Sequence, residues 1–253
     1  MKKVLIIILS LAGMESGYAQ KQIATTEQLW VGYINQTRLS DKWDVVADIH
    51  LRTKDKFTKG FYQSVFRAGA AYHVAENASL AAGYAYFDYY PGDNHPNVAQ
   101  SEHRIWEQVQ WNTNYSKIHL QQRIRLEERY RRKIKSDGEL DNGYSFNYRA
   151  RYSLNFLYPL GKHPYAVKSI ALIAHEEVMV NYGKEIVYNT FDQNRFLLGF
   201  NYYIAANNSM QLGYMNVLQQ QSSGNKYKNI HAIRLYYYHT LDLRKTIHPH
   251  HES

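Results

Sequence analysis

The chain has 253 residues, a formal charge of +8 at pH 7 and no cysteine. These values exclude a disulfide scaffold, thiol chemistry and a lipid-bearing cysteine, and the length suits one large domain. Tyrosine is unusually abundant, with 24 residues against 9 phenylalanines and 4 tryptophans. Its apolar ring and polar tip suit a boundary between lipid and water.

Residues 1–19 have the pattern of a secretory signal peptide. Lys2 and Lys3 precede an apolar run over residues 4–11, and a small-x-small sequence ends at Ala19, where we expect cleavage. The apolar run is too short to span the ~30 Å of hydrocarbon in a bilayer. No later stretch reaches the ~18 continuous apolar residues of a transmembrane helix.

Long segments in which apolar and polar residues alternate make up most of the remaining chain. In 144–158, YSFNYRARYSLNFLY, apolar and aromatic residues occupy every second position, with Ser, Asn and Arg between most of them. Side chains alternate across a β-strand, so such a segment has one apolar and one polar face. The most regular segments are 43–52, 62–74, 118–131, 144–158 and 194–204. Less regular alternation is found in 28–38, 79–90, 102–114, 168–181, 209–221 and 227–242.

The breaks between these segments have the composition of turns. All five prolines lie in breaks or in the C-terminal tail, as expected if the segments are strands, because proline cannot donate to a strand ladder. Short breaks such as 39–42 and 206–208 tend to alternate with longer ones such as 91–101 and 132–143. This rhythm is typical of an up-and-down barrel, whereas a soluble β-sandwich has shorter strands and buries their apolar faces.

We therefore predict an all-β fold, a transmembrane up-and-down antiparallel β-barrel over residues 20–245. Strands of about 9–15 residues with an apolar outer face suit lipid, and closure satisfies every backbone hydrogen bond. Residues 246–253 are predicted to form a disordered tail. Eleven segments are found, but bacterial barrels have an even number of strands. The prediction is therefore twelve strands, with ten as the alternative.

Four runs carry a resemblance to a known family. They are QLWVGYINQTRLSDKWDVVADIHLR, YYPGDNHPNVAQSEHRIWEQVQW, LQQRIRLEERYRRK and YNTFDQNRFLLGFNY, of which EHRIWEQ and RLEER are the most specific parts. Over nearly the whole mature chain the sequence resembles the uncharacterised bacterial family catalogued as domain of unknown function 2490, seen often in Bacteroidetes. The resemblance implies a barrel in the outer membrane of a double-membrane bacterium. It implies no activity, substrate or catalytic residue.

The polar faces concentrate charge in the middle of the chain. Consecutive strands of a meander are neighbours, so these residues are predicted to form one patch on the lumen wall. The patch comprises Glu102, Arg104, Arg123, Arg125, Glu127, Arg129, Arg149, Arg151, His175 and Glu177. In one interpretation arginine and glutamate fill the lumen with a lattice of salt bridges. In the other, the excess of arginine attracts anions into a passage.

Catalysis in the barrel wall needs a nucleophile and an oriented histidine. His103 lies next to Glu102, but adjacent strand residues point to opposite faces. His175 and Glu177 share a face, yet the sequence contains no GxSxG motif. The nearest serines are Ser101 and Ser145. No catalytic residue is therefore predicted.

Three other groups of residues have a simple structural interpretation. One group that could ligate a metal is Asp93, Asn94 and His95, but a turn-rich hydrated loop explains these residues as well. A second is His248, His250 and His251, which lie in the tail that we expect to be disordered. The basic run 129–135 suggests nucleic acid, which a secreted protein does not meet. It could instead continue as a helix, or be a strand end that meets anionic lipid headgroups or lipopolysaccharide. No cofactor, metal or nucleic acid is expected.

The leading functional hypothesis is a narrow channel or transport barrel for small, anionic solutes. The second is a closed barrel that acts structurally or as part of an envelope complex with unknown partners. The third is an outer-membrane enzyme that modifies lipid.

Overall fold

The computed structural model describes residues 21–92, 97–136 and 138–244, and within these ranges the regular structure is entirely β-strand. The strands are β1 (Gln22–Arg38), β2 (Trp43–Thr53), β3 (Phe61–Ala75), β4 (Ala78–Tyr89), β5 (Gln100–Tyr115), β6 (Ile118–Ser136), β7 (Glu139–Leu160), β8 (Ile170–Tyr182), β9 (Phe191–Ala205), β10 (Asn208–Gln220) and β11 (Lys226–Asp242). The predicted signal peptide, the loop residues 93–95 and the predicted tail 246–253 lie outside the described residues. Among the residues described, no helix is long and apolar enough to cross a membrane.

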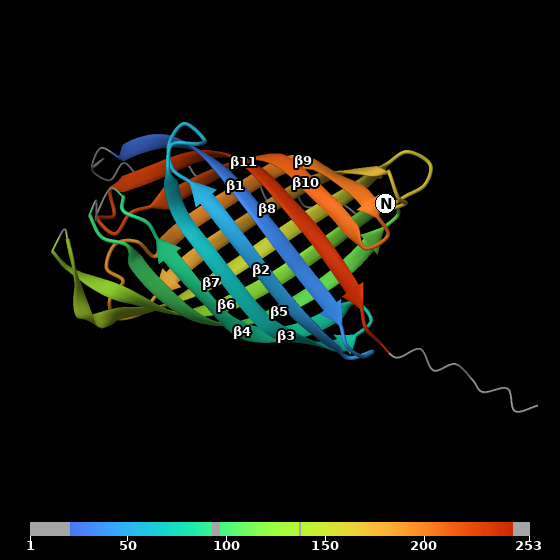
Figure 1. Cartoon of the computed structure of the whole chain (residues 1–253), viewed down its shortest axis with the longest axis horizontal. Coiled ribbons are helices and arrows are strands. Elements are labelled where there is room, and N and C mark those ends of the chain that lie inside the picture. Colours follow the sequence, from blue (N-terminus) through green and yellow to red (C-terminus); the bar gives the residue numbers. More distant parts are fainter. Residues whose placement is uncertain (1–20, 93–96, 137, 245–253) are drawn as a thin grey trace, which may run out of the picture.

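The strands close into a single barrel, which confirms the predicted all-β barrel fold (Figure 1). Every neighbouring pair is antiparallel except β1 and β11, which run parallel from the pair Gln22–Lys226 to the pair Arg38–Asp242. The expected count of twelve strands is corrected to eleven in the described part of the chain. An odd number makes the first and last strands of a meander point the same way, so the barrel closes through a parallel pair.

The two ends of the barrel differ. One end, here called the turn end, carries the short turns 39–42, 76–77, 116–117 and 206–207 and one longer connection, 161–169. The opposite end, here called the loop end, carries longer connections such as 54–60 and 183–190. The hairpin of β6 and β7 extends beyond the rim at the loop end (Figure 1), where Ile134 pairs with Leu140 and Ser136 with Glu139.

The outer face of the barrel is apolar, as the alternation predicts. Large exposed side chains follow one another around the wall, among them Val45, Ile49, Phe66, Ile105, Ile124, Phe156, Leu198, Phe200, Leu212 and Ile233. Aromatic rings gather toward each end. Tyr130, Phe146, Tyr148 and Tyr182 form a row across β6, β7 and β8 toward the loop end, with successive ring centroids 4.8, 4.8 and 5.0 Å apart. Trp43 meets Tyr72 at 5.0 Å beside the turn 39–42.

The interior is filled by side chains. One buried apolar cluster lies around Trp30 and a second around Trp106. The Trp106 indole lies against the facing glycines Gly69 of β3 and Gly83 of β4, which are paired in register. A Cβ atom added at Gly83 would lie 2.6 Å from Trp106 Cζ2. These two glycines therefore make the space that lets the indole enter the lumen.

We expect Gly83→Ala to lower the free energy of unfolding by about 1–3 kcal/mol, because the new methyl group overpacks the indole and the facing strand. The measurement is the denaturant midpoint of the refolded full chain. Gly138→Ala is the control, since a Cβ atom there meets nothing within 4 Å. A Gly83→Ala protein as stable as this control would show that Trp106 does not fill the lumen.

Candidate functional site

The ten residues of the predicted charge patch all lie at inward-facing positions of four neighbouring strands. They are Glu102 and Arg104 on β5, Arg123, Arg125, Glu127 and Arg129 on β6, Arg149 and Arg151 on β7, and His175 and Glu177 on β8. The side chains are buried, except that Arg123 and His175 are half-buried. The period-two alternation explains this arrangement, since each strand contributes every second residue to the lumen.

Glu102 is a fully buried carboxylate shared by three arginines. Its oxygens accept hydrogen bonds from the Nε atoms of Arg104 at 2.5 Å, Arg129 at 2.7 Å and Arg131 at 2.6 Å. The Tyr89 hydroxyl donates a further bond at 3.2 Å. Strand register explains the contact, because Glu102 of β5 pairs directly with Arg131 of β6.

Glu127 holds a second set of arginines one layer deeper. It accepts bonds from Arg149 Nε at 2.9 Å and Arg151 Nη1 at 2.6 Å, and Arg104 Nη1 lies 3.3 Å away. Arg149 reaches on to Asp192 of β9 at 2.8 Å. Arg104 and Arg149 therefore each bridge two carboxylates, which connects β5 to β9 through side chains alone.

Glu177 completes the network. It accepts two bonds from Arg151 Nη2 at 2.8 and 2.9 Å and one from Arg123 at 2.7 Å, while Arg195 Nη1 lies 3.7 Å away. Three arginines thus surround each of the three glutamates. Charge-assisted bonds of this kind fix both partners in place, and we call Glu102, Glu127, Glu177 and their arginines the lumen lattice.

The residues considered for catalysis do not come together. His103 lies on the outer face, where its ring bonds the Tyr84 hydroxyl at 2.5 Å. Ser145 donates to the backbone oxygen of Arg131 at 3.2 Å. Glu177 is occupied by arginines, so it does not orient His175. Within the described ranges no three His, Cys, Asp or Glu side chains are placed to hold a metal ion.

The basic run 129–135 forms the last part of β6, which continues as a strand to Ser136. The helical alternative is therefore wrong. Lys135 pairs with Glu139 at 3.2 Å, and Lys133 lies 3.9 Å from Glu185. Both pairs are exposed at the loop end and carry little stability.

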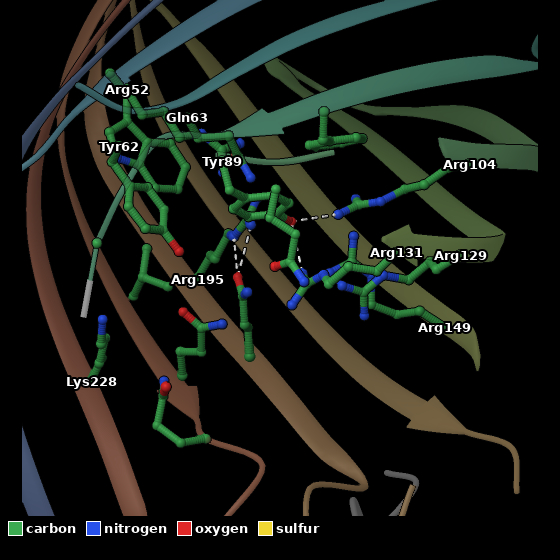
Figure 2. A pocket seen from close by; sticks show the side chains of 18 of the residues that line it. Arg52, Tyr62, Gln63, Tyr89, Arg104, Arg129, Arg131, Arg149, Arg195 and Lys228 are labelled. Carbon is green, nitrogen blue, oxygen red and sulfur yellow. Dashed lines mark hydrogen bonds between the residues drawn. The ribbon is translucent and has the colours of Figure 1, made fainter. Parts of the chain in front are cut away.

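Above the lumen lattice lies a cavity of about 300 Å³, whose lining reaches Gly92, Gln100 and Gln221 at the loop end. Figure 2 shows side chains that line it. Its lining contains eight arginines and one lysine, and no carboxylate among the residues that the structure describes. The cations are Arg52, Arg67, Arg104, Arg129, Arg131, Arg149, Arg151, Arg195 and Lys228. The glutamates of the lattice lie behind their arginines, so the surface that a ligand meets is cationic.

Five of these cations were not in the predicted patch: Arg52, Arg67, Arg131, Arg195 and Lys228. Four of them lie on the polar faces of the alternating segments 43–52, 62–74, 118–131 and 194–204. The alternation pattern therefore predicts that these four side chains face the lumen. It could not show that strands as distant in sequence as β2 and β9 face one another across the lumen.

Below the cavity the lumen is closed by packed side chains. Arg125 lies 4.8 Å from the Trp106 ring centroid and bonds Gln108 at 2.7 Å. Other buried side chains at lumen-facing positions of this layer are Ile173, Leu197 and Met215. A separate cavity of about 230 Å³ at the turn end shares no lining residue with the upper one. From this separation and the packed layer between the two cavities, we infer that the upper cavity is blind.

Comparison with known proteins identifies a family. A family model described as "Protein of unknown function (DUF2490)" matches residues 27–228, which is most of the barrel. No curated protein and no solved structure matches the chain.

Proposed function

The chain belongs to the DUF2490 family, and from that premise we propose that it is an outer-membrane β-barrel that binds small anions in a blind cavity of its lumen. The predicted signal peptide would export it, and the host would be a double-membrane bacterium. The observation that carries the binding function is the cationic lining of the upper cavity.

The outer surface supports the location in a membrane. Exposed aliphatic and aromatic side chains cover the wall, and aromatic rings gather toward the two ends, as in barrels that meet headgroups at both interfaces. A closed barrel also leaves no unpaired strand edge in hydrocarbon. At the loop end the Arg132 guanidinium lies 5.3 Å from the Tyr144 ring centroid, a place where it would meet anionic lipopolysaccharide.

The cavity supports anion binding because its positive charge is held in place before a ligand arrives. Arginine keeps its proton at any physiological pH and presents a planar fork to oxyanions. The lumen lattice prevents its arginines from turning away. A cleft lined by charge of one sign also concentrates counter-ions from solution.

Transport of the same anions is the second candidate, because each end of the barrel has its own cavity. A solute would have to displace the layer of Arg125 and Trp106 that separates the two. Binding requires no such movement, so it is the function that the geometry supports best.

The test is calorimetric titration of the refolded full chain in detergent with sodium phosphate. We expect saturable binding that weakens as sodium chloride is added, since salt screens charge. Spermidine and glycerol, a cation and a neutral molecule, are expected to give no binding heat. Preference for spermidine, or no binding of phosphate at low salt, would contradict the proposal.

A further inference from the structure

Arg52 and Arg195 have mainly neutral hydrogen-bond partners, unlike the other six arginines of the cavity, which pair with carboxylates. Arg52 Nη1 donates to Gln63 at 2.6 Å, and Arg195 donates to Gln193 from Nε at 3.0 Å and from Nη2 at 2.7 Å. These partners are neutral amides. Arg52 Nε is buried without a hydrogen bond, and Arg195 has only the long contact of 3.7 Å to Glu177.

Arg52 and Arg195 also share one aromatic ring. Their guanidinium carbons lie 3.8 and 5.2 Å from the centroid of the Trp30 ring, although the residues come from β2, β9 and β1. Two like charges are thus held over the same indole, and among the described residues the one carboxylate paired with either is Glu177, 3.7 Å from Arg195 Nη1. Both side chains are only partly exposed, and incompletely compensated charges in such a place are costly, so this arrangement favours an anion as a further partner.

The charge of the whole lining indicates how much negative charge the ligand carries. The eight lining arginines have five carboxylates among their ion-pair partners: Asp48, Glu102, Glu127, Glu177 and Asp192. Within the described part of the chain, at least three of the eight positive charges therefore remain uncompensated. A doubly charged group such as a phosphate monoester matches this excess better than a single carboxylate, and its oxygens suit two guanidinium forks.

The rest of the lining indicates what the anionic group is attached to. Five glutamine amides face the cavity, and an amide can both donate to and accept from a hydroxyl. They are Gln63, Gln100, Gln193, Gln219 and Gln221. Guanidinium groups already cover the rings of Trp30, Phe87 and Tyr89, with Arg104 at 3.4 Å from Phe87 and Arg131 at 4.6 Å from Tyr89. Because these ring faces are occupied, the site suits a polyhydroxyl body better than a stacked base.

We infer that the anion of the proposed function is a phosphorylated sugar. Its phosphate lies between Arg52 and Arg195 beside Trp30, and its hydroxyls bond the glutamine amides. A cavity of about 300 Å³ is at the lower end of ligand sites, so it holds a small unit. A free sugar phosphate and the phosphorylated sugar head of a glycolipid share this chemistry, and both can enter from the loop end.

The experiment compares four probes by calorimetry on the full chain: inorganic phosphate, glucose, glucose 6-phosphate and a glucosamine disaccharide phosphate that represents a glycolipid head. We expect a phosphorylated sugar to bind at least about tenfold more tightly than inorganic phosphate, because its hydroxyls add hydrogen bonds to the glutamine amides. Glucose alone is expected not to bind. Tighter binding of the monosaccharide indicates a free solute, and tighter binding of the disaccharide indicates a lipid head.

Variants locate the site. Arg52→Gln and Arg195→Gln are each expected to weaken sugar phosphate binding about ten- to hundredfold, the effect of losing one charged hydrogen bond. Removing one of two neighbouring like charges relieves their repulsion, so the thermal unfolding midpoint of the ligand-free protein is expected to stay unchanged or rise. Loss of a merely structural contact would lower this midpoint. Arg234→Gln is the matched control. Arg234 bonds Gln211 at 2.6 Å and lies over Tyr236, also with neutral partners, but outside the cavity lining.

Two results would overturn parts of the account separately. Equal affinity for inorganic phosphate and both phosphorylated sugars would refute the sugar while leaving an anion site. Unchanged binding in both Arg52→Gln and Arg195→Gln would refute the placement between these residues. If no anion bound at low salt, the proposed function itself would fail.

Discussion

Replacing Glu127 with glutamine is expected to lower the free energy of unfolding by about 3–5 kcal/mol, the usual cost of removing one partner from a buried ion pair. The carboxylate is buried and in contact with Arg104, Arg149 and Arg151. A neutral amide leaves these three charges with less compensation in the lumen. The measurement is equilibrium unfolding in denaturant of the chain refolded into lipid vesicles.

Glu139→Gln provides the control for this prediction. Glu139 pairs with Lys135 at 3.2 Å, but both side chains are exposed at the loop end. Exposed pairs contribute about 0–1 kcal/mol, so the control should unfold almost as the wild type does. Equal midpoints for Glu127→Gln and Glu139→Gln would show that the lumen lattice is not the network described above.

A Leu198→Arg substitution is expected to destabilise the protein in lipid vesicles by about 2–4 kcal/mol, the cost of an arginine facing lipid near the bilayer midplane. Leu198 is the central residue of β9 and points outward, 48% exposed. In a water-soluble protein an exposed leucine tolerates arginine with an effect within about 0.5 kcal/mol. The substitution therefore separates a membrane barrel from a soluble one.

The matched control is Leu39→Arg. Leu39 is also 48% exposed, but it lies in the turn 39–42 at the turn end, where a membrane barrel meets water or headgroups. An arginine there is expected to cost about 0–1 kcal/mol. If both variants lost the same small amount of stability, the outer face of β9 would not be in hydrocarbon.

The wall of the barrel was predictable because period-two alternation is local. The segment 144–158 lies within β7, and its apolar positions face outward as expected. The segment 28–38 lies within β1, although its alternation is less regular. The segments themselves numbered eleven, and only the rule of even strand number led to an expectation of twelve. The parallel pairing of β1 with β11 joins strands at opposite ends of the chain, so no local sequence pattern predicts it.

The site could be predicted only in part, for a similar reason. The predicted patch contained Glu102 and Arg129 on neighbouring strands, and the structure brings them into contact at 2.7 Å. The meeting of Arg52 and Arg195 over Trp30 depends on how far the barrel curves and how its strands shift in register. The sharing of Glu127 by three arginines depends on side-chain reach across the lumen. Neither follows from the order of residues in a strand.

Single-channel recording in a planar bilayer tests the central claim most directly. The refolded chain, shown to be inserted, is placed under a potassium chloride gradient. A lumen closed by the layer of Arg125 and Trp106 predicts no stable conductance steps, while the same preparation still binds phosphate. Stable steps that disappear on adding phosphate or a sugar phosphate would contradict the blind cavity and establish an anion-conducting passage instead.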